Sequence, residues 1–179
     1  GSEMCIRDRI GSLLQPEQIV KYGELTLREN QIAYAEPSFF RLFDFELLKG
    51  DKKTCLSMPG QVVITERIAS KYFKDEDPIG KIFIFTGAYD KISCEVTGVM
   101  KEMPSNSHIH YSFLISYKSL SKYMQEYWYK HEAYTYVLLD SPERKAEIER
   151  EFPVMAEKYK TDEALKNKTW GVSLIPLAD

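Results

Sequence analysis

The sequence predicts an α+β fold with a β-rich body and a strand–helix–strand unit at its C-terminal end. Three observations lead to this prediction. Short segments with alternating apolar residues dominate the middle of the chain, between residues 61 and 99. One amphipathic helix, at residues 66–73, interrupts them. Near the C-terminus a second helix begins at residues 141–143, Ser-Pro-Glu, between two extended segments.

The composition is that of an ordinary globular protein. The 179 residues are 44% hydrophobic and 28% charged, with a net charge of -3, which suits one domain or two small ones. Because no Lys/Arg patch dominates, we expect no nucleic-acid partner. No apolar run reaches the roughly 18 residues of a membrane helix. Cys5, Cys55 and Cys94 lack the spacing of a zinc site or a disulfide scaffold, and the pattern around Cys94 indicates a buried small side chain.

The N-terminal third is mostly extended. The stretch EMCIRDR at residues 3–9 has no clear periodicity, and residues 1–20 are interpreted as a leader without predicted structure. The pattern from Tyr22 to Ala35, with a turn at residues 28–30, predicts a hairpin. A short helix with an apolar stripe of phenylalanines follows Pro37. The stripe is Phe39, Phe40 and Phe43, and the segments after it are an extended stretch at 45–48, a turn at 49–51 and a loop at 52–60.

The middle of the chain alternates between strands and helices. A strand at residues 61–65 leads into the helix at 66–73, whose apolar face is typical of a buried contact. Strands at 81–86 and 91–99 form a hairpin, and Gly98 indicates a bulge or close packing. The remaining predicted elements are a loop at 101–107, a strand at 108–116 and an amphipathic helix at 118–127.

Three consecutive acidic residues, Asp75, Glu76 and Asp77, raise the question of a metal or catalytic site. Pro78 disfavours helix at Asp77, and Gly80 permits a tight turn, so the run marks a helix–turn–strand joint. The spacing of an EF-hand loop is absent. We interpret the acidic run as solvated turn residues.

The C-terminal part differs from the middle in its pattern. The alternation at residues 133–139 predicts a strand, and a helix begins at Ser141 with its apolar face at Ile148 and Phe152. Pro153 lies inside this helix and predicts a kink or two abutting helices. A closing strand within residues 169–179 would complete a βαβ-like unit.

Few residues suggest chemistry. His108 and His110 form an H-x-H pair that could serve a metal if His131 or Glu132 supplied a third ligand. No nucleophile motif, P-loop or dinucleotide fingerprint is present. We therefore predict no catalytic, cofactor-binding or metal-ligating residue and no cofactor. The aromatic cluster at 38–45 is typical of a core, whereas the one at 123–136 is too large for one buried face and suggests a partner surface.

Three segments in fixed order resemble the MacB-like periplasmic core domain of FtsX-type ABC transporter permeases. They are "PSFFRLFDFELLKGD", "VVITERIASKYFKDEDPIGK" and "VTGVMKEMPSNSH". The resemblance implies a membrane-proximal porter-like part, residues 21–38 and 133–179, and an inserted sabre-like β-rich part, residues 39–132. The resemblance implies that the porter-like part begins with a strand and a helix of its own, and here only the leader precedes Tyr22; we expect either that this part is incomplete or that its N-terminus departs from the family pattern.

The resemblance implies a periplasmic domain of an inner-membrane permease, connected to the membrane through flanking helices outside this sequence. Its partners would be a cytoplasmic ABC ATPase subunit, a second permease copy and a periplasmic protein or peptide. The domain would not be an enzyme; it would transmit conformational change driven by ATP hydrolysis, with its polar clusters as structural joints. Two alternatives stay open: an extracytoplasmic sensor with a deep ligand pocket, and a metal-dependent enzyme using His108 and His110.

Overall fold

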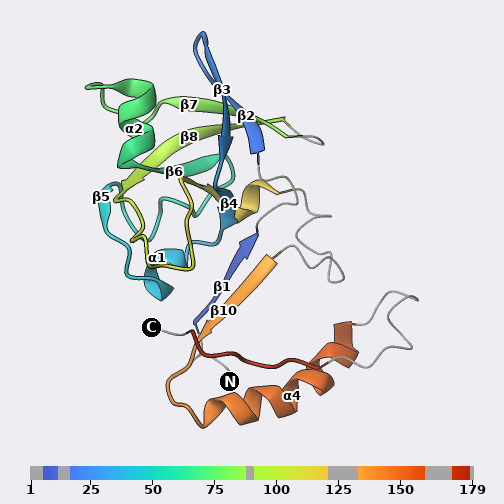
Figure 1. Ribbon diagram of the computed structural model, residues 1–179. Coiled ribbons are helices and arrows are strands. Elements are labelled where there is room, and N and C mark those ends of the chain that lie inside the picture. Colours follow the sequence, from blue (N-terminus) through green and yellow to red (C-terminus); the bar gives the residue numbers. More distant parts are fainter. Residues whose placement is uncertain (1–5, 12–16, 88–90, 121–132, 160–170, 178–179) are drawn as a thin grey trace. The chain divides into compact units, whose positions relative to one another are not determined.

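The computed structural model describes residues 6–11, 17–87, 91–120, 133–159 and 171–177 (Figure 1). The chain divides into two compact units, one formed by Arg7–Val137 and one by Leu138–Asp179 with Gly1–Ile6. Within the described ranges the fold is mixed α+β, with one large sheet and few helices, which confirms the predicted fold class. The division into porter-like and sabre-like parts stays a prediction.

In the described residues, β-strands alternate with a few helical elements. The strands are β1 (Ile6–Gly11), β2 (Glu17–Tyr22), β3 (Leu25–Asn30), β4 (Ile32–Ala35), β5 (Leu47–Lys49), β6 (Gln61–Thr65), β7 (Ile82–Thr86), β8 (Lys91–Met100), β9 (Phe113–Ser116) and β10 (Ala133–Leu138). The helical elements are α1 (Phe39–Leu42), α2 (Glu66–Phe73), η1 (Tyr117–Ser119) and α4 (Arg144–Tyr159).

The strands of the described ranges form a single sheet in the order β10-β1-β4-β9-β6-β8-β7-β2-β3, with β5 paired to β8. Two pairs, β4 with β9 and β6 with β8, run parallel. The registers of β1–β4, β2–β3, β2–β7, β5–β8, β6–β9 and β7–β8 are antiparallel. A mixed sheet of this kind joins segments that lie far apart in the sequence, such as β4 and β9.

The central strands are buried on both faces. Every residue of β4 and β9 is buried, and so are Val62 to Thr65 of β6. Because side chains alternate along a strand, each central strand contributes to two cores. Val62 and Ile64 enter one core, whereas Val63 between them enters the other. The sheet is therefore a partition with a hydrophobic core on each face.

The first core is rich in aromatic rings and is covered by α2 (Figure 1). This helix begins at the N-cap Thr65, whose hydroxyl oxygen accepts from the amide N–H of Ile68. Its apolar face presents Ile68, Tyr72 and Phe73 to the sheet, as the sequence predicted. Phe83 lies at the centre of the ring contacts, and its neighbours are Tyr22, Tyr72, Phe73, Phe85 and Phe113.

The second core is closed by α1 and the segment after it. Phe39 and Phe40 are buried, and Phe39 lies 5.2 Å from Phe43 and 5.7 Å from Phe45 between ring centroids. The prediction that the 38–45 aromatic cluster belongs to a core is confirmed. Cys55 also lies in this core, and Cys94 lies in the other, as predicted for Cys94.

A buried carboxylate ties the sheet edge to α2. The Glu29 side chain on β3 is 8% exposed and accepts from Lys71 Nζ at 2.6 Å and from Tyr72 Oη at 2.8 Å. Burial and the neighbouring carboxylate raise the pKa of Tyr72, so its hydroxyl stays a proton donor. This cluster fixes the helix against the β2–β3 hairpin.

The β6–β8 pair contains a bulge, because Val62 pairs with Val96 and Val63 pairs with Gly98. The extra residue is Thr97, whose hydroxyl donates to Cys55 O at 2.6 Å. A Cβ at Gly98 would lie 3.1 Å from the Val63 side chain. Both predicted features at Gly98, the bulge and the close packing, are confirmed.

The predicted hairpin at residues 22–35 is wrong in its turn and its partners. β3 pairs with β2, and the pair Tyr22–Leu25 closes a tight turn at Gly23, which has φ +56°. Residues 28–30, expected to turn, are part of β3. The chain leaves β3 at Gln31, with φ 57°, so β4 joins β1 and β9 instead. The segment 1–20, given no predicted structure, contains the strand β1 and most of β2.

Two other predicted strands are shorter or absent. Only Phe113–Ser116 of the segment 108–116 is a strand, because the preceding amide groups bond outside the ladder: Ile109 N–H donates to Ser107 Oγ and Tyr111 N–H to Met103 Sδ. Residues 171–177 are not a strand, and Leu174 N–H donates to a Glu149 carboxylate.

The C-terminal helix and the strand before it agree with the sequence in type. β10 lies where residues 133–139 predicted a strand. α4 is a single helix that contains Pro153. The alternative of two abutting helices is therefore wrong. The predicted helix at 118–127 lies mostly outside the described residues, which contain its start only as the turn η1. None of the described helices has the length and hydrophobicity that a bilayer span requires.

Candidate functional site

The acidic run lies in the turn between α2 and β7, as the sequence predicted. Glu76 accepts from Lys81 Nζ at 2.8 Å, and Asp77 accepts from Lys49 Nζ at 3.0 Å. Asp77 also accepts from the amide N–H of Ile79 at 3.3 Å. These exposed ion pairs connect the turn to β5 and β7. The two carboxylates are therefore each paired with a lysine, one on β5 and one just before β7.

The ion pairs lower the pKa of both carboxyl groups. Hydrogen bonding to Lys81 lowers the pKa of Glu76 below its ordinary value of 4.5, and hydrogen bonding to Lys49 lowers that of Asp77 below 3.8. A carboxyl group with a lowered folded-state pKa stabilises the fold above its unfolded-state pKa. That contribution is lost as the pH falls through the folded-state pKa.

The double variant Glu76→Gln/Asp77→Asn should consequently melt slightly below the wild type at neutral pH. The difference in melting temperature should shrink as the pH falls below about 4, where the wild-type carboxyl groups also become protonated. Thermal melts across the pH range measure it. The matched control is Asp75→Asn in the same turn, which has no ion pair with any described residue. A gap between wild type and double variant that widens towards acid pH would contradict this assignment.

His108 and His110 are not placed as a ligand pair on a strand. Both are exposed and lie in the irregular segment before β9. His108 Nε2 is 3.4 Å from Tyr136 Oη, so this ring contacts β10 instead of a metal-binding partner. In the described part of the chain no three His, Cys, Asp or Glu side chains are grouped for a metal, and the possible third ligands His131 and Glu132 lie outside it.

Tyr136, the ring beside His108, is part of an aromatic patch. Tyr136 packs edge-on against Phe43 at 5.0 Å, and burial raises the pKa of both Tyr136 and Tyr111. Tyr134, on the same strand as Tyr136, is 64% exposed. Of the aromatic cluster at 123–136, therefore, one tyrosine packs on the second core and one faces solvent, while residues 123–132 lie outside the described ranges.

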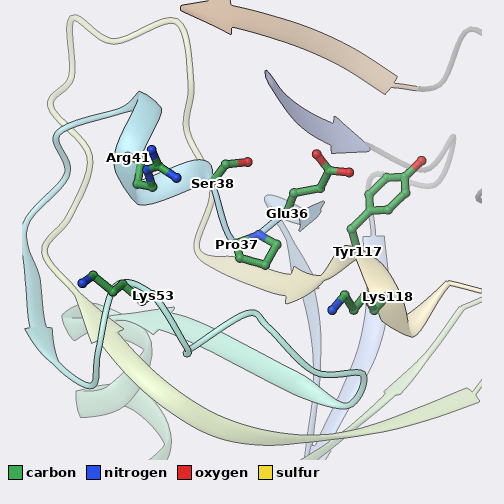
Figure 2. Close-up of a pocket in the computed structure, with 7 residues that line it drawn as sticks. All are labelled: Glu36, Pro37, Ser38, Arg41, Lys53, Tyr117 and Lys118. Atoms are coloured by element: carbon green, nitrogen blue, oxygen red, sulfur yellow. The ribbon is translucent and has the colours of Figure 1, made fainter. Parts of the chain in front are cut away.

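One hollow among the described residues is a groove of about 900 Å³ beside α1 (Figure 2). Sequence reasoning missed this groove, because its residues are far apart in the chain and carry no motif. Three of the lining side chains are cationic, Arg41, Lys53 and Lys118, and one is a carboxylate, Glu36. Pro37, Ser38 and Tyr117 complete the lining. We take this groove, here named the basic groove, as the candidate binding site.

The basic groove offers charge and shape for binding. The charged side chains of its described lining are three cations and a carboxylate, and neither described cysteine lines it, because Cys55 and Cys94 are buried in the cores. Burial raises the pKa of Cys55 to about 11 and of Cys94 to about 12, so both stay thiols at neutral pH.

Comparison with known proteins gives a family match and several structural relatives. The family model described as MacB-like periplasmic core domain matches residues 8–153. A permease domain from Porphyromonas gingivalis is 19% identical with a TM-score of 0.71, covering 96% of this chain and 79% of that one. The periplasmic region of MacB from Actinobacillus actinomycetemcomitans is 16% identical with a TM-score of 0.61, covering 88% and 68%.

The extracellular domain of the noncanonic ABC-type transporter YknZ from Gram-positive bacteria is also similar. It is 16% identical with a TM-score of 0.55, covering 84% of this chain and 74% of that one. At these identities the three structures share the fold with this chain. No curated protein sequence matches the chain.

Proposed function

Because the chain belongs to the MacB-like periplasmic core domain family, as the match over residues 8–153 shows, we propose that it transmits motion from ATP hydrolysis to a periplasmic partner. The chain is the periplasmic domain of a MacB-like ABC transporter permease. Permeases of this kind work with cytoplasmic ATPases, and the family is not a class of enzymes. Mechanical transmission is the step proposed here.

The observation that best supports this proposal is the double-sided core. A body that transmits motion must move without deforming, and close-packed interiors resist deformation. Strands β4, β6 and β9 are buried on both faces, so bending the sheet would disturb two cores at once. The Glu29–Lys71–Tyr72 cluster further holds α2 to the hairpin at the sheet edge.

The partners follow from this role. We propose that the complete permease pairs with a second copy, receives its motion from a cytoplasmic ABC ATPase subunit and acts on a periplasmic protein or peptide. The domain itself carries no catalysis in this proposal. Its polar joints, such as the turn with Asp77 and Lys49, maintain the shape of the body.

Distances between spin labels in the full permease–ATPase complex test the proposal. Ser70 on α2 and Ser93 on β8 are both exposed, so Ser70→Cys with Ser93→Cys supplies an internal label pair. Ser70→Cys alone, in both permease copies, supplies a pair between copies. Cys55 and Cys94 are buried thiols with raised pKa, so they remain unlabelled, and Cys5→Ser removes the third cysteine of this chain.

The expected result is a distance between copies that differs between the nucleotide-free and the ATP-trapped complex, with an unchanged internal distance. An internal distance that changes with nucleotide would show that the body deforms. Distances that are all independent of nucleotide would show that no motion reaches the domain. Either result would reject mechanical transmission.

The sensor alternative is favoured by one observation, the basic groove. A sensor would bind a small ligand there and gain thermal stability that rises with the logarithm of the ligand concentration above Kd. A sensor pocket normally encloses most of its ligand. Because the hollow here is a groove, we keep the sensor function as the second candidate. It is tested by measuring the melting temperature of the chain with increasing concentrations of small organic anions.

A further inference from the structure

The basic groove carries positive charge on a chain that is acidic overall. Its three cationic side chains and one carboxylate leave an excess of two positive charges, whereas the whole chain has a net charge of -3. We propose that the basic groove binds an extended acidic peptide segment of a periplasmic partner. This inference rests on the proposed function in naming a periplasmic partner; the binding itself is testable on the chain alone.

Two of the cations are available for a ligand. Lys49 and Lys52, on the neighbouring stretch of chain, are paired with Asp77 and Asp44 at 3.0 and 3.6 Å. In contrast, no described residue forms an ion pair with Arg41 or Lys53. Both side chains line the groove from exposed positions. Binding a carboxylate there breaks no ion pair within the described protein, and the attraction to Arg41 and Lys53 is offset only in part by the Asp51 carboxylate beside Lys53 and by Glu36 in the lining.

The backbone under each cation is fixed. Arg41 lies on α1, whose residues Phe39 and Phe40 are buried in the second core. Lys53 lies in a turn closed by Asp51, whose Oδ1 accepts from Lys53 N–H at 2.8 Å and from Thr54 N–H at 3.1 Å.

Lys118 follows the buried strand β9, and its Nζ donates to Ser57 O at 2.7 Å. The three cations thus stand on a preorganised framework, and preorganisation lowers the entropic cost of binding.

The arrangement favours an extended ligand over a single small anion. Figure 2 shows Arg41, Lys53 and Lys118 at separate places around the groove, each from a different element, instead of converging on one point. A volume of about 900 Å³ is much larger than one phosphate requires. A peptide with carboxylates at intervals can meet several of these cations, whereas a long polyanion would also meet the acidic remainder of the chain.

Fluorescein-labelled hexaglutamate, titrated against the 179-residue chain and followed by fluorescence anisotropy, tests the inference. Hexaglutamate should bind at low salt and weaken as salt is added. The double variant Arg41→Gln/Lys53→Gln should weaken binding about fivefold or more, as expected for the loss of two exposed charge pairs. Arg41→Glu/Lys53→Glu should abolish it.

The matched control is Lys21→Gln/Lys91→Gln, which removes the same charge from exposed positions on β2 and β8. It should bind as the wild type does. If hexaglutamate fails to bind at millimolar concentration, or if the control weakens binding as much as the groove variant, the site is not this groove and the inference is wrong. Displacement of the peptide by equimolar inorganic phosphate would equally overturn it, by showing a small-anion site.

These outcomes are independent of the test of mechanical transmission. Nucleotide-dependent distances are measured in the full permease complex, and peptide binding is measured on the chain alone. If the permease moves with nucleotide but the groove does not bind hexaglutamate, the inference is wrong and the proposed function stands.

Discussion

Replacing Phe83 by alanine is expected to lower the free energy of unfolding by about 3–5 kcal/mol, the largest effect of any single substitution considered for this chain. The side chain is fully buried at the centre of the first core. Its ring lies within van der Waals or edge-to-face range of five others, so alanine would leave a cavity that no single neighbour can fill. The centroid distances are 4.9 Å to Tyr72, 5.4 Å to Phe73, 5.9 Å to Phe113 and 6.0 Å to Tyr22 and Phe85.

Equilibrium unfolding in urea measures this loss. The control is Ile82→Ala, one residue earlier on β7, whose side chain is 55% exposed and points to the opposite face. That substitution should cost less than about 1 kcal/mol. Equal losses for both variants would mean that Phe83 is not the centre of the core.

Gly50→Ala is expected to be the second most damaging substitution, at about 2–4 kcal/mol. Gly50 has φ +97°, where a side chain is strained, and a Cβ there would lie 2.4 Å from Thr97 O and 3.0 Å from Gly98 Cα. Both atoms belong to the backbone of the β8 bulge, so neither can rotate away. Alanine must therefore displace β5 or the bulge, in addition to adopting a strained positive φ.

The variant Gly80→Ala separates the cost of backbone strain at positive φ from the cost of the steric clash. Gly80 also has a positive φ, +81°, but no neighbouring atom lies within 4 Å of the place that an alanine Cβ would take, so only the backbone strain of about 1–2 kcal/mol applies. Circular dichroism melts of both variants should show a clearly larger drop for Gly50→Ala. Similar drops would mean that the close approach to Thr97 relaxes at little cost.

Helices and strands could be predicted from the sequence where a segment carried a single pattern of apolar spacing, with no competing turn or strand signal. The helix α2 follows from its apolar spacing and from Thr65 as N-cap, and β7 follows from the alternation of Phe83 and Phe85 with isoleucines. The acidic joint also followed, because Pro78 and Gly80 act on their immediate neighbours. The family resemblance was likewise accessible, since its three segments are continuous in sequence, and the match over residues 8–153 confirms it.

The failures share a different cause. The segment 108–112 has the alternation of a strand, yet its amides bond to Ser107 and Met103 in the preceding loop and, at Ser112, to Gln31 O, which only the folded chain brings within reach. The hairpin was misplaced because Gly23 and residues 28–30 are both good turn signals, and the choice depends on which strand pairs with β2.

By itself, then, the sequence determined the fold class, the family, the type of most elements and the position of the acidic run in a helix–turn–strand joint, because each depends on residues adjacent in the chain. Only the tertiary structure decided the strand order, the two-sided core and the basic groove. Arg41, Lys53 and Lys118 come together through the pairing of strands distant in sequence, and no local pattern encodes which cations meet around one groove.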